Sequence, residues 1–394
     1  MKMGSIKDRV AIVGMGCIKF GENWDQSAWD MIVDAAYEAY EDAGIEPKDI
    51  QAAWLGTVSS GEVGNFLSTP LKLQYIPVTR VENRCATGTD TVRNACFAVA
   101  AGIYDIVLAL GVEKQKDYGF AGVVRNMEHP VIDPRGAAYP QFAEKAVRYF
   151  HHYGLDPAEG KETIGKISVN SHHNGSMNPK AHFQKEVALE KVINAPIMGW
   201  PLGLFDCCPV TDGAAAAIIT SPEVAKTLKP NGDYLLVKSI AISAGPGDHN
   251  RREDYDQIHF EETVRAGQMA YAEAGIKDPF KELSMAELHD CFSITELITY
   301  EDLGFCPKGE AKDYIESGAF ALEGELPVQV DGGLKSFGHP LGASGIRMIY
   351  EIYLQNQGKA GDRQLKKPGL GLTHNLGGAE GGYIISVGIF GPPE

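Results

Sequence analysis

The sequence predicts an α/β protein built from two similar halves, because one succession of elements occurs twice along the chain. An apolar run over Val10–Gly16 is followed by a helical pattern over Ala28–Ala43, as expected for a strand and a crossover helix. The same order returns with Tyr234–Ile242 and Glu261–Ala274, and both helical patterns end in similar letters, Ala-Tyr-x-x-Ala-Gly-Ile. We therefore expect a duplicated unit in which each half has a central sheet and the two halves pack as a pseudo-dimer.

The later elements also follow one order in both halves. After each first helix, a turn that contains Gly-Ile leads to a second strand, over Ile50–Leu55 or Met285–Leu288. One helix then begins near Cys85 and another near His339, each leads to a further strand, and each half closes with a strand rich in Gly and Ala. The expected ranges are Thr89–Ala101, Ile106–Leu110 and Asp212–Thr220 in the first half, and Ile294–Leu303, Ala343–Gln355, Leu370–Thr373 and Gly381–Phe390 in the second.

These patterns divide the chain into two halves and an insertion. We expect residues 1–116 and 202–230 to form the N-terminal half, 117–201 an inserted cap, and 231–394 the C-terminal half. Segments this long without apolar runs are usually functional. The insertion is also the basic part of an acidic chain, so it is either a solvated surface or a place for a phosphate-bearing ligand. Its basic residues are Arg125, Arg135, Lys145, Arg148, Lys161, Lys166, Lys180 and Lys185.

Composition excludes several classes of protein. The formal charge of −16 over 394 residues argues against general nucleic-acid binding, which needs an excess of Lys and Arg. The seven cysteines form no CxxC pair, which fits neither a disulfide framework nor a zinc site, so we expect no metal and a reducing cytoplasm. No signal core or membrane-spanning run is present, and we expect a soluble protein.

Cys85 is the candidate nucleophile. It stands at the head of a helical pattern, where the positive end of the helix dipole stabilises a thiolate. The small residues that follow it, from Ala86 to Thr89, allow a substrate and the backbone to approach closely. The alternative is the ordinary state of most cysteines, which are buried and inert.

Three histidines are candidate acids and bases. His339 lies between Gly338 and Pro340, at the start of a helical pattern, and imidazole has a suitable pKa to activate a thiol. His374 follows a predicted strand and precedes Asn375 and a pair of glycines, Gly377 and Gly378, whose N–H groups can face an oxyanion. His289 ends another strand, and such strand ends commonly carry active sites.

Several of these segments together resemble the thiolase superfamily, and in particular the sterol-carrier-protein type thiolases and their bacterial and archaeal relatives. The likeness covers nearly the whole chain in order, and the pattern is also similar to that of benzoylsuccinyl-CoA thiolase. The segments that carry it are Glu82–Val112, Asp206–Ala214, His289-Asp-Cys-Phe, Gly338-His-Pro-Leu-Gly-Ala-Ser-Gly and His374-Asn-Leu-Gly-Gly.

The resemblance implies the thiolase fold, with duplicated βαβαβαββ halves packed as αβαβα layers. It implies that Cys85 takes up an acyl group as a thioester, that His339 activates it, and that His289 stands where many thiolases have an asparagine that holds an oxyanion water. His374 matches a second cysteine of common thiolases, so here an imidazole would serve as the acid and base. Asn375, Gly377, Gly378 and Arg84 are the expected oxyanion or substrate contacts.

The implied reaction is cleavage of a 3-oxoacyl-CoA by coenzyme A, or the reverse Claisen condensation, with coenzyme A as substrate and no covalently bound cofactor. The relatives with this ending commonly work with a small zinc-ribbon OB-fold protein, so we expect such a partner beside a homodimer or larger assembly. Two alternatives stay open, namely a thiolase-like aldolase, which does without the cysteine, and a non-catalytic scaffold or acyl carrier. Arg84 and Arg347 either meet a substrate carboxylate or form structural ion pairs.

Overall fold

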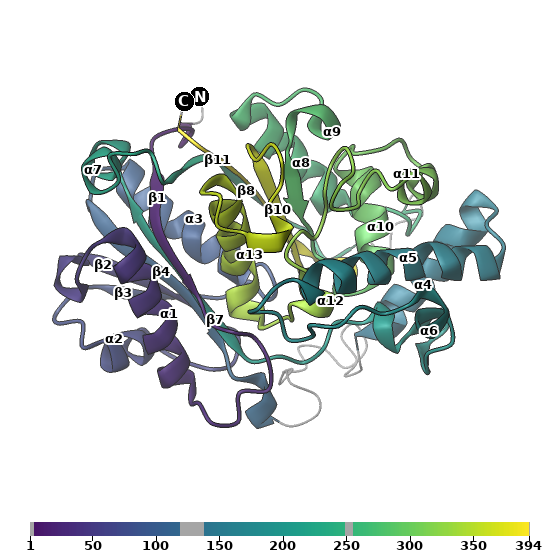
Figure 1. Ribbon diagram of the computed structural model, residues 1–394, viewed down its shortest axis with the longest axis horizontal. Helices are drawn as coiled ribbons and strands as arrows, with labels where there is room; N and C mark the ends of the chain where they lie inside the picture. The colour runs from purple at the N-terminus through teal and green to yellow at the C-terminus, as the bar shows by residue number, and fades with distance from the viewer. Residues whose placement is uncertain (1–3, 119–137, 249–254, 394) are drawn as a thin grey trace.

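A computed structural model describes residues 4–118, 138–248 and 255–393, and its centre is a mixed nine-stranded sheet (Figure 1). The strand order is β3-β2-β4-β7-β1-β8-β11-β10-β9, so the strands of the two halves are not interleaved. The first half contributes β1 (Ala11–Cys17), β2 (Ala52–Gly56), β3 (Val78–Val81), β4 (Ile106–Glu113) and β7 (Gly213–Thr220). The second contributes β8 (Leu235–Ala244), β9 (Met285–Glu287), β10 (Gly371–Gly377) and β11 (Ile384–Gly391).

The two halves share this sheet through a narrow junction. Strand β1 pairs with β8 only at Ala11–Leu236 and Ile12–Leu235, whereas β1 pairs with β7 along nearly its whole length. From the sequence we expected a central sheet in each half. The structure differs in that this antiparallel contact joins them.

Helices form layers on both sides of each half-sheet, and the predicted αβαβα order is confirmed. Helix α1 (Ala28–Ala43) packs on β1 and β7, and α8 (Glu261–Ala274) packs on β8 and β11. Between the two half-sheets, α3 (Thr87–Ala100) and α13 (Leu341–Asn356) pack against each other. Helix α3 contacts β4 and β2, while α13 contacts β4 and β7 on one side and β10 on the other.

Glycines let the two central helices approach to backbone contact. A Cβ atom on Gly345 would lie 2.4 Å from Thr89 Oγ1 and 2.5 Å from Thr89 N. One on Gly342 would lie 2.4 Å from the carbonyl oxygen of Gly56, at the end of β2. No side chain larger than hydrogen fits there without moving backbone. The N-terminal ends of α3 and α13 are therefore held side by side.

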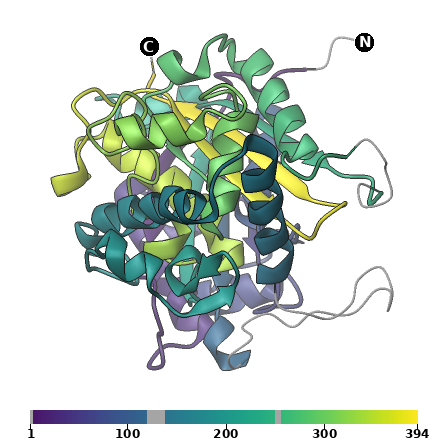
Figure 2. The same ribbon diagram turned by 90° about the vertical axis from the view of Figure 1, so that its right-hand side faces the viewer.

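The inserted segment packs mainly on the second half, although in the sequence it lies within the first half. Its described part contains α4 (Tyr139–Tyr153), α5 (Pro157–Ser176), α6 (Leu189–Ile193) and the small hairpin of β5 (Ile197–Gly199) and β6 (Leu202–Gly203). Helix α5 contacts α10 (Ser293–Asp302) and α12 (Gly333–Ser336) of the second half. Figure 2 shows the teal helices of the insertion against the green elements of the second half. Residues 119–137 of the predicted cap, including Arg125 and Arg135, lie outside the described residues.

Helices that the sequence analysis did not specify complete the architecture. They are α2 (Asn65–Leu71), α7 (Pro222–Leu228), α9 (Pro279–Glu282) and α11 (Ala311–Ser317). Among the residues that the structure covers, no helix combines the length and the apolar character that crossing a membrane requires.

We expect Gly345→Ala to destabilise the protein by roughly 1–3 kcal/mol, because the new methyl group meets the backbone of α3 in a full core. The free energy of unfolding in urea would measure this. Gly21→Ala is the matched control, since its nearest neighbour would lie 3.4 Å from the added Cβ. Equal stability of the two variants would contradict the close helix crossing.

Candidate active site

Cys85 lies in a tight turn between strand β3 and helix α3. The residue before it, Arg84, has a left-handed backbone with φ of +53°, a conformation that non-glycine residues adopt at a cost and often at functional sites. Hydrogen bonds fix the turn, from the Asn83 N–H to Thr87 Oγ1 at 2.8 Å and from Asn83 Nδ2 to Asp90 Oδ2 at 2.6 Å. Cys85 is half-buried and directly precedes the first turn of α3, as predicted.

His339 lies at the corresponding end of α13, and its hydrogen bonds define its tautomer. The Ser344 hydroxyl donates to the carbonyl oxygen of Pro340 at 3.0 Å, so it can only accept in its 2.8 Å contact with His339 Nδ1. On this hydrogen-bond pattern we assign the proton to Nδ1. Nε2 is left as an acceptor and is buried with no hydrogen-bond partner among the described residues.

The turn before His339 requires a glycine. Gly338 has φ of +114°, and a Cβ there would lie 2.6 Å from Thr211 Cγ2. Both the backbone conformation and the neighbouring threonine exclude larger residues. This fixes the direction from which the imidazole of His339 enters the site.

His289 completes a compact group with Cys85 and His339. The rings of His289 and His339 meet edge to face with centroids 5.0 Å apart. One Sγ or ring-nitrogen atom from each of the three residues lies within 4.8 Å of the others. Within the described residues this is the one such group of three close enough to hold a metal ion. Chemically, the group can act as a thiol with two imidazoles or as ligands for a soft cation such as Zn²⁺.

His374 is not part of this compact group. The strand that we expected to end at Thr373 extends as β10 to Gly377, so His374 lies inside a strand and not in a turn. Its Nε2 is 3.0 Å from Thr263 Oγ1 on α8, and its Nδ1 accepts the backbone N–H of His289 at 3.5 Å. The ring is fully buried and contacts the backbone of His289.

The neighbouring residues of β10 face the central helices. Asn375 Oδ1 accepts a hydrogen bond from Thr89 Oγ1 of α3 at 2.7 Å, on the sheet face opposite to His374. Gly377 lies beside the nucleophile, because a Cβ on it would come within 2.9 Å of Cys85 N. Gly378 follows with φ of +101°. Of the predicted oxyanion or substrate residues, Arg84 and Gly377 therefore lie next to Cys85, and Asn375 instead joins strand to helix.

Burial keeps the three histidines uncharged. Removal from water lowers the pKa of His339 to about 3, with the charge of Arg347 as a further cause. Burial alone lowers the pKa of His374 to about 3. Burial, followed by the neighbouring His339 and His374, lowers the pKa of His289 well below its usual value. Near neutral pH each ring is therefore neutral, with one protonated and one unprotonated nitrogen.

Ion pairs engage most of the described basic residues of the insertion, for which phosphate binding was one of two alternatives. In the described part of the insertion, ion pairs join Lys145 to Glu380, Lys161 to Asp206, Lys166 to Glu162 and Glu316, and Lys180 to Glu38. Arg347 is also a structural residue, since it is fully buried and paired with Glu287 and Asp331. For Arg347 these contacts favour the structural ion pair over a substrate contact, and the four lysines of the insertion are held by carboxylates of this chain.

Comparison with known proteins relates the whole chain to one family. Residues 10–193 match the family model of the thiolase N-terminal domain, and residues 246–387 match the model described as thiolase C-terminal domain-like. An acetyl-CoA acetyltransferase of Methanothermobacter thermautotrophicus is 37% identical over 96% of this chain and 98% of its own length. The benzoylsuccinyl-CoA thiolase subunit BbsB of Thauera aromatica is 31% identical over 95% of this chain and 96% of its own.

A solved structure agrees with this relationship. The Ltp2-ChsH2(DUF35) aldolase has a TM-score of 0.84 and 26% identity, and the match covers 98% of both chains.

The buried state of His374 predicts a pH-dependent stability. The pKa of histidine in an unfolded chain is about 6.5, whereas the pKa of His374 in the folded protein is about 3. As the pH falls between these values, the unfolded chain binds the proton first, so each pH unit costs the folded state roughly 1.4 kcal/mol. We expect His374→Gln to remove this share of the acid destabilisation, measured by urea unfolding between these two pH values.

The exposed His152 provides the matched control, and His152→Gln should keep the pH dependence of the wild type. An unchanged pH dependence in His374→Gln would mean that folding does not lower the pKa of His374.

Proposed function

The chain belongs to the thiolase family and is an acyltransferase, and we propose that it cleaves a 3-oxoacyl-CoA with coenzyme A, or runs the reverse condensation, through an acyl-Cys85 thioester. The observation that carries the residue assignment is the compact group of Cys85, His289 and His339. Within it, His339 presents an unprotonated nitrogen that has no other hydrogen-bond partner among the described residues. A thiol next to such a base is the arrangement that covalent catalysis requires.

In the first half-reaction, His339 Nε2 takes the proton of the Cys85 thiol, and the thiolate attacks the 3-oxo carbon. The bond between the α- and β-carbons breaks, which leaves the acyl group on Cys85 and an enolate on the departing acyl-CoA. Hydrogen bonds from neutral His289 and from protonated His339 stabilise this enolate. The proton held by His339 then passes to the α-carbon, so that charge and atoms balance.

In the second half-reaction, coenzyme A enters and gives its thiol proton to His339. Its thiolate attacks the thioester carbonyl and releases the acyl group as a second acyl-CoA, and the proton returns to Cys85. Gly377 packs against the chain beside the nucleophile, since a Cβ on it would lie 2.9 Å from Cys85 N and 2.9 Å from Arg84 Cβ. The residues act identically in reverse, so the same group also performs the condensation.

We propose that His374 acts through His289 and not as the proton donor that we expected from the sequence. Both of its ring nitrogens are engaged, one by Thr263 and one by the backbone of His289. A proton on His374 would also need to pass His289 to reach the substrate. Its contacts suit a residue that holds the His289 loop in place.

For the substrate, we propose a short 3-oxoacyl-CoA as the first to test, because the archaeal relative at 37% identity is named as an acetyl-CoA acetyltransferase. For the assembly, we propose a homodimer or larger oligomer in the cytoplasm, with a small zinc-ribbon OB-fold protein as partner. The structural neighbour whose title joins Ltp2 to ChsH2(DUF35) supports the idea of a second component.

The second candidate is an aldolase that cleaves a 3-hydroxyacyl-CoA, and the same neighbour is the observation that favours it, since its title names an aldolase. The two functions differ at Cys85. An aldolase releases an aldehyde or ketone and leaves no acyl group on the protein, whereas the thiolase reaction requires a thioester.

We expect intact-mass spectrometry to show one acyl adduct after a 3-oxoacyl-CoA is mixed with the wild type without added coenzyme A. Cys85→Ser should lose the adduct and thiolysis, because a hydroxyl does not ionise as a thiol does. Cys96→Ser, on the buried face of the same helix, should keep both. Thiolysis without any adduct would end the covalent model, and release of a carbonyl product from a 3-hydroxyacyl-CoA would favour the aldolase.

We expect His374→Ala to lower kcat of thiolysis by roughly tenfold to a hundredfold, since displacement of a catalytic group by about 1 Å has effects of this size. His374→Gln should recover most of the rate, because its amide can still donate to Thr263 and accept from His289 but cannot transfer protons. Steady-state kinetics would decide. A Gln variant as slow as the Ala variant would restore the proton-transfer role.

A further inference from the structure

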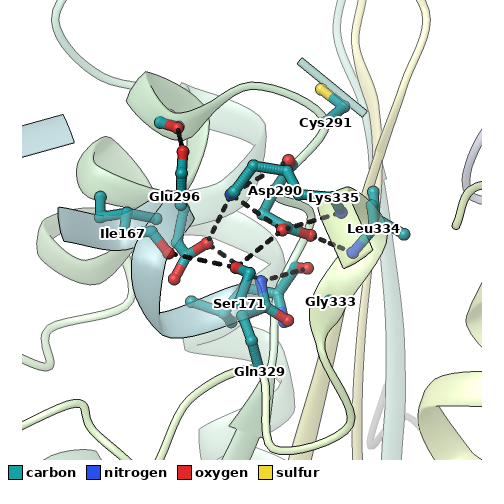
Figure 3. Close-up of polar contacts among 12 residues, drawn as sticks. Ile167, Ser171, Asp290, Cys291, Glu296, Gln329, Gly333, Leu334 and Lys335 are labelled. Atoms are coloured by element: carbon teal, nitrogen blue, oxygen red, sulfur yellow. Dashed lines mark hydrogen bonds and ion pairs between the residues drawn. The ribbon is translucent and has the colours of Figure 1, made fainter. Parts of the chain in front are cut away.

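Beyond the residues that touch the substrate, a buried lysine connects the two histidine loops. Lys335 belongs to α12 and precedes His339 by four positions. Its Nζ lies 2.8 Å from Asp290 Oδ2 and 3.3 Å from Glu296 Oε2, and all three side chains are 0% exposed (Figure 3). A lysine is almost never fully buried unless it is paired, so this position has a specific cause.

Asp290 joins the two loops directly. It follows His289 in the chain, and its carboxylate accepts the backbone N–H of Leu334 at 2.5 Å and of Lys335 at 3.3 Å. Ser171 of the insertion donates to the same carboxylate at 3.4 Å. In Figure 3, Asp290 accordingly lies among Lys335, Leu334 and Ser171. The carboxylate next to His289 is thus bound to the segment that leads to His339.

Gln329 provides a second connection on the other side of His289. Its Nε2 donates to the carbonyl oxygen of Leu288 at 2.9 Å, and its Oε1 accepts the Leu288 N–H at 3.2 Å. Its Nε2 also lies 3.2 Å from Glu296 Oε2. Both chain neighbours of His289 are therefore held by residues 329–335.

Charge makes Lys335 the centre of this cluster. Burial alone would lower the pKa of Lys335, but the adjacent charges of Asp290 and Glu296 outweigh it, so the pKa is raised and the ammonium group stays charged. Burial raises the pKa of Glu296 above its usual value, and the adjacent ammonium group of Lys335 opposes this rise. Loss of the ammonium group would leave a buried carboxylate without a cation contact, which is strongly unfavourable.

We propose that Lys335 is a positioning residue that fixes His289 and His339 relative to Cys85. The proposal rests on the proposed function, because it assigns Lys335 to that same site. Lys335 touches neither the nucleophile nor either ring in the contacts above. It acts by holding together the two loops from which the rings project.

The test compares neutral variants of Lys335 with a neutral variant of another buried cation. Arg363 pairs with Glu351 at 2.9 Å, with both side chains almost fully buried. Its side chain also donates to the carbonyl oxygen of Met177, and within the described residues neither contact involves residues 288–292 or 332–339. Arg363→Met should lower stability but keep kcat of thiolysis. Lys335→Met and Lys335→Gln should lower kcat by about tenfold to a hundredfold with KM within about twofold, because substrate binding remains and the geometry of the bases is lost.

Alkylation of Cys85 by iodoacetamide gives a second readout that needs no substrate. We expect both Lys335 variants to be alkylated more slowly than the wild type and than Arg363→Met, because His339 no longer meets the thiol. Absence of an acyl adduct in the wild type would overturn the thiolase function, while the alkylation rates would still decide the role of Lys335.

The proposal would be overturned if either folded Lys335 variant kept the wild-type alkylation rate and the wild-type kcat. It would also be overturned if Arg363→Met lost as much alkylation rate and kcat as the Lys335 variants. If neither neutral Lys335 variant folds while Arg363→Met does, Lys335 serves the fold alone and the positioning role is also overturned.

Discussion

The contact between the glycine faces of α3 and α13 is the constraint on which the site depends. Cys85 precedes one helix and His339 the other, and neither half of the chain contains both. Gly342 and Gly345 allow the helices to approach until backbone meets backbone, which brings the two N-terminal ends together between the half-sheets. Cys85 and His339 therefore owe their proximity to packing in the core.

Around this crossing, the second half supplies a shell of buried polar side chains. Buried carboxylates are matched by Lys335 and Arg347, and the histidines between them are kept neutral by the loss of water. A neutral imidazole that is surrounded by fixed dipoles can exchange a proton with little rearrangement. The cost of burying so many polar groups is offset by hydrogen bonds that join elements distant in sequence, so the shell also contributes to the tertiary structure.

Sequence patterns predicted regular elements better than side-chain directions. The bounds of α1 and α8 agree with the expected ranges, since each helix ends at a left-handed glycine, Gly44 or Gly275. The strand that carries His374 was predicted too short, because the glycines after it suggest a turn, whereas pairing with β11 continues to Gly377. In a strand, adjacent residues face opposite sides of the sheet. The direction of the His374 side chain could therefore not be inferred without the pairing of β10 with β11. Nothing in the sequence pointed to a buried role for Lys335, because lysine is ordinarily a surface residue.

The placement of the insertion has a consequence for how the chain unfolds. Its helices branch from the first half, yet Phe142 stacks on Phe292 with ring centroids 4.5 Å apart, and Ser171 reaches the His289 loop. The second half cannot separate from the first without exposing this apolar contact to water. The two halves are therefore expected to unfold together as one cooperative unit.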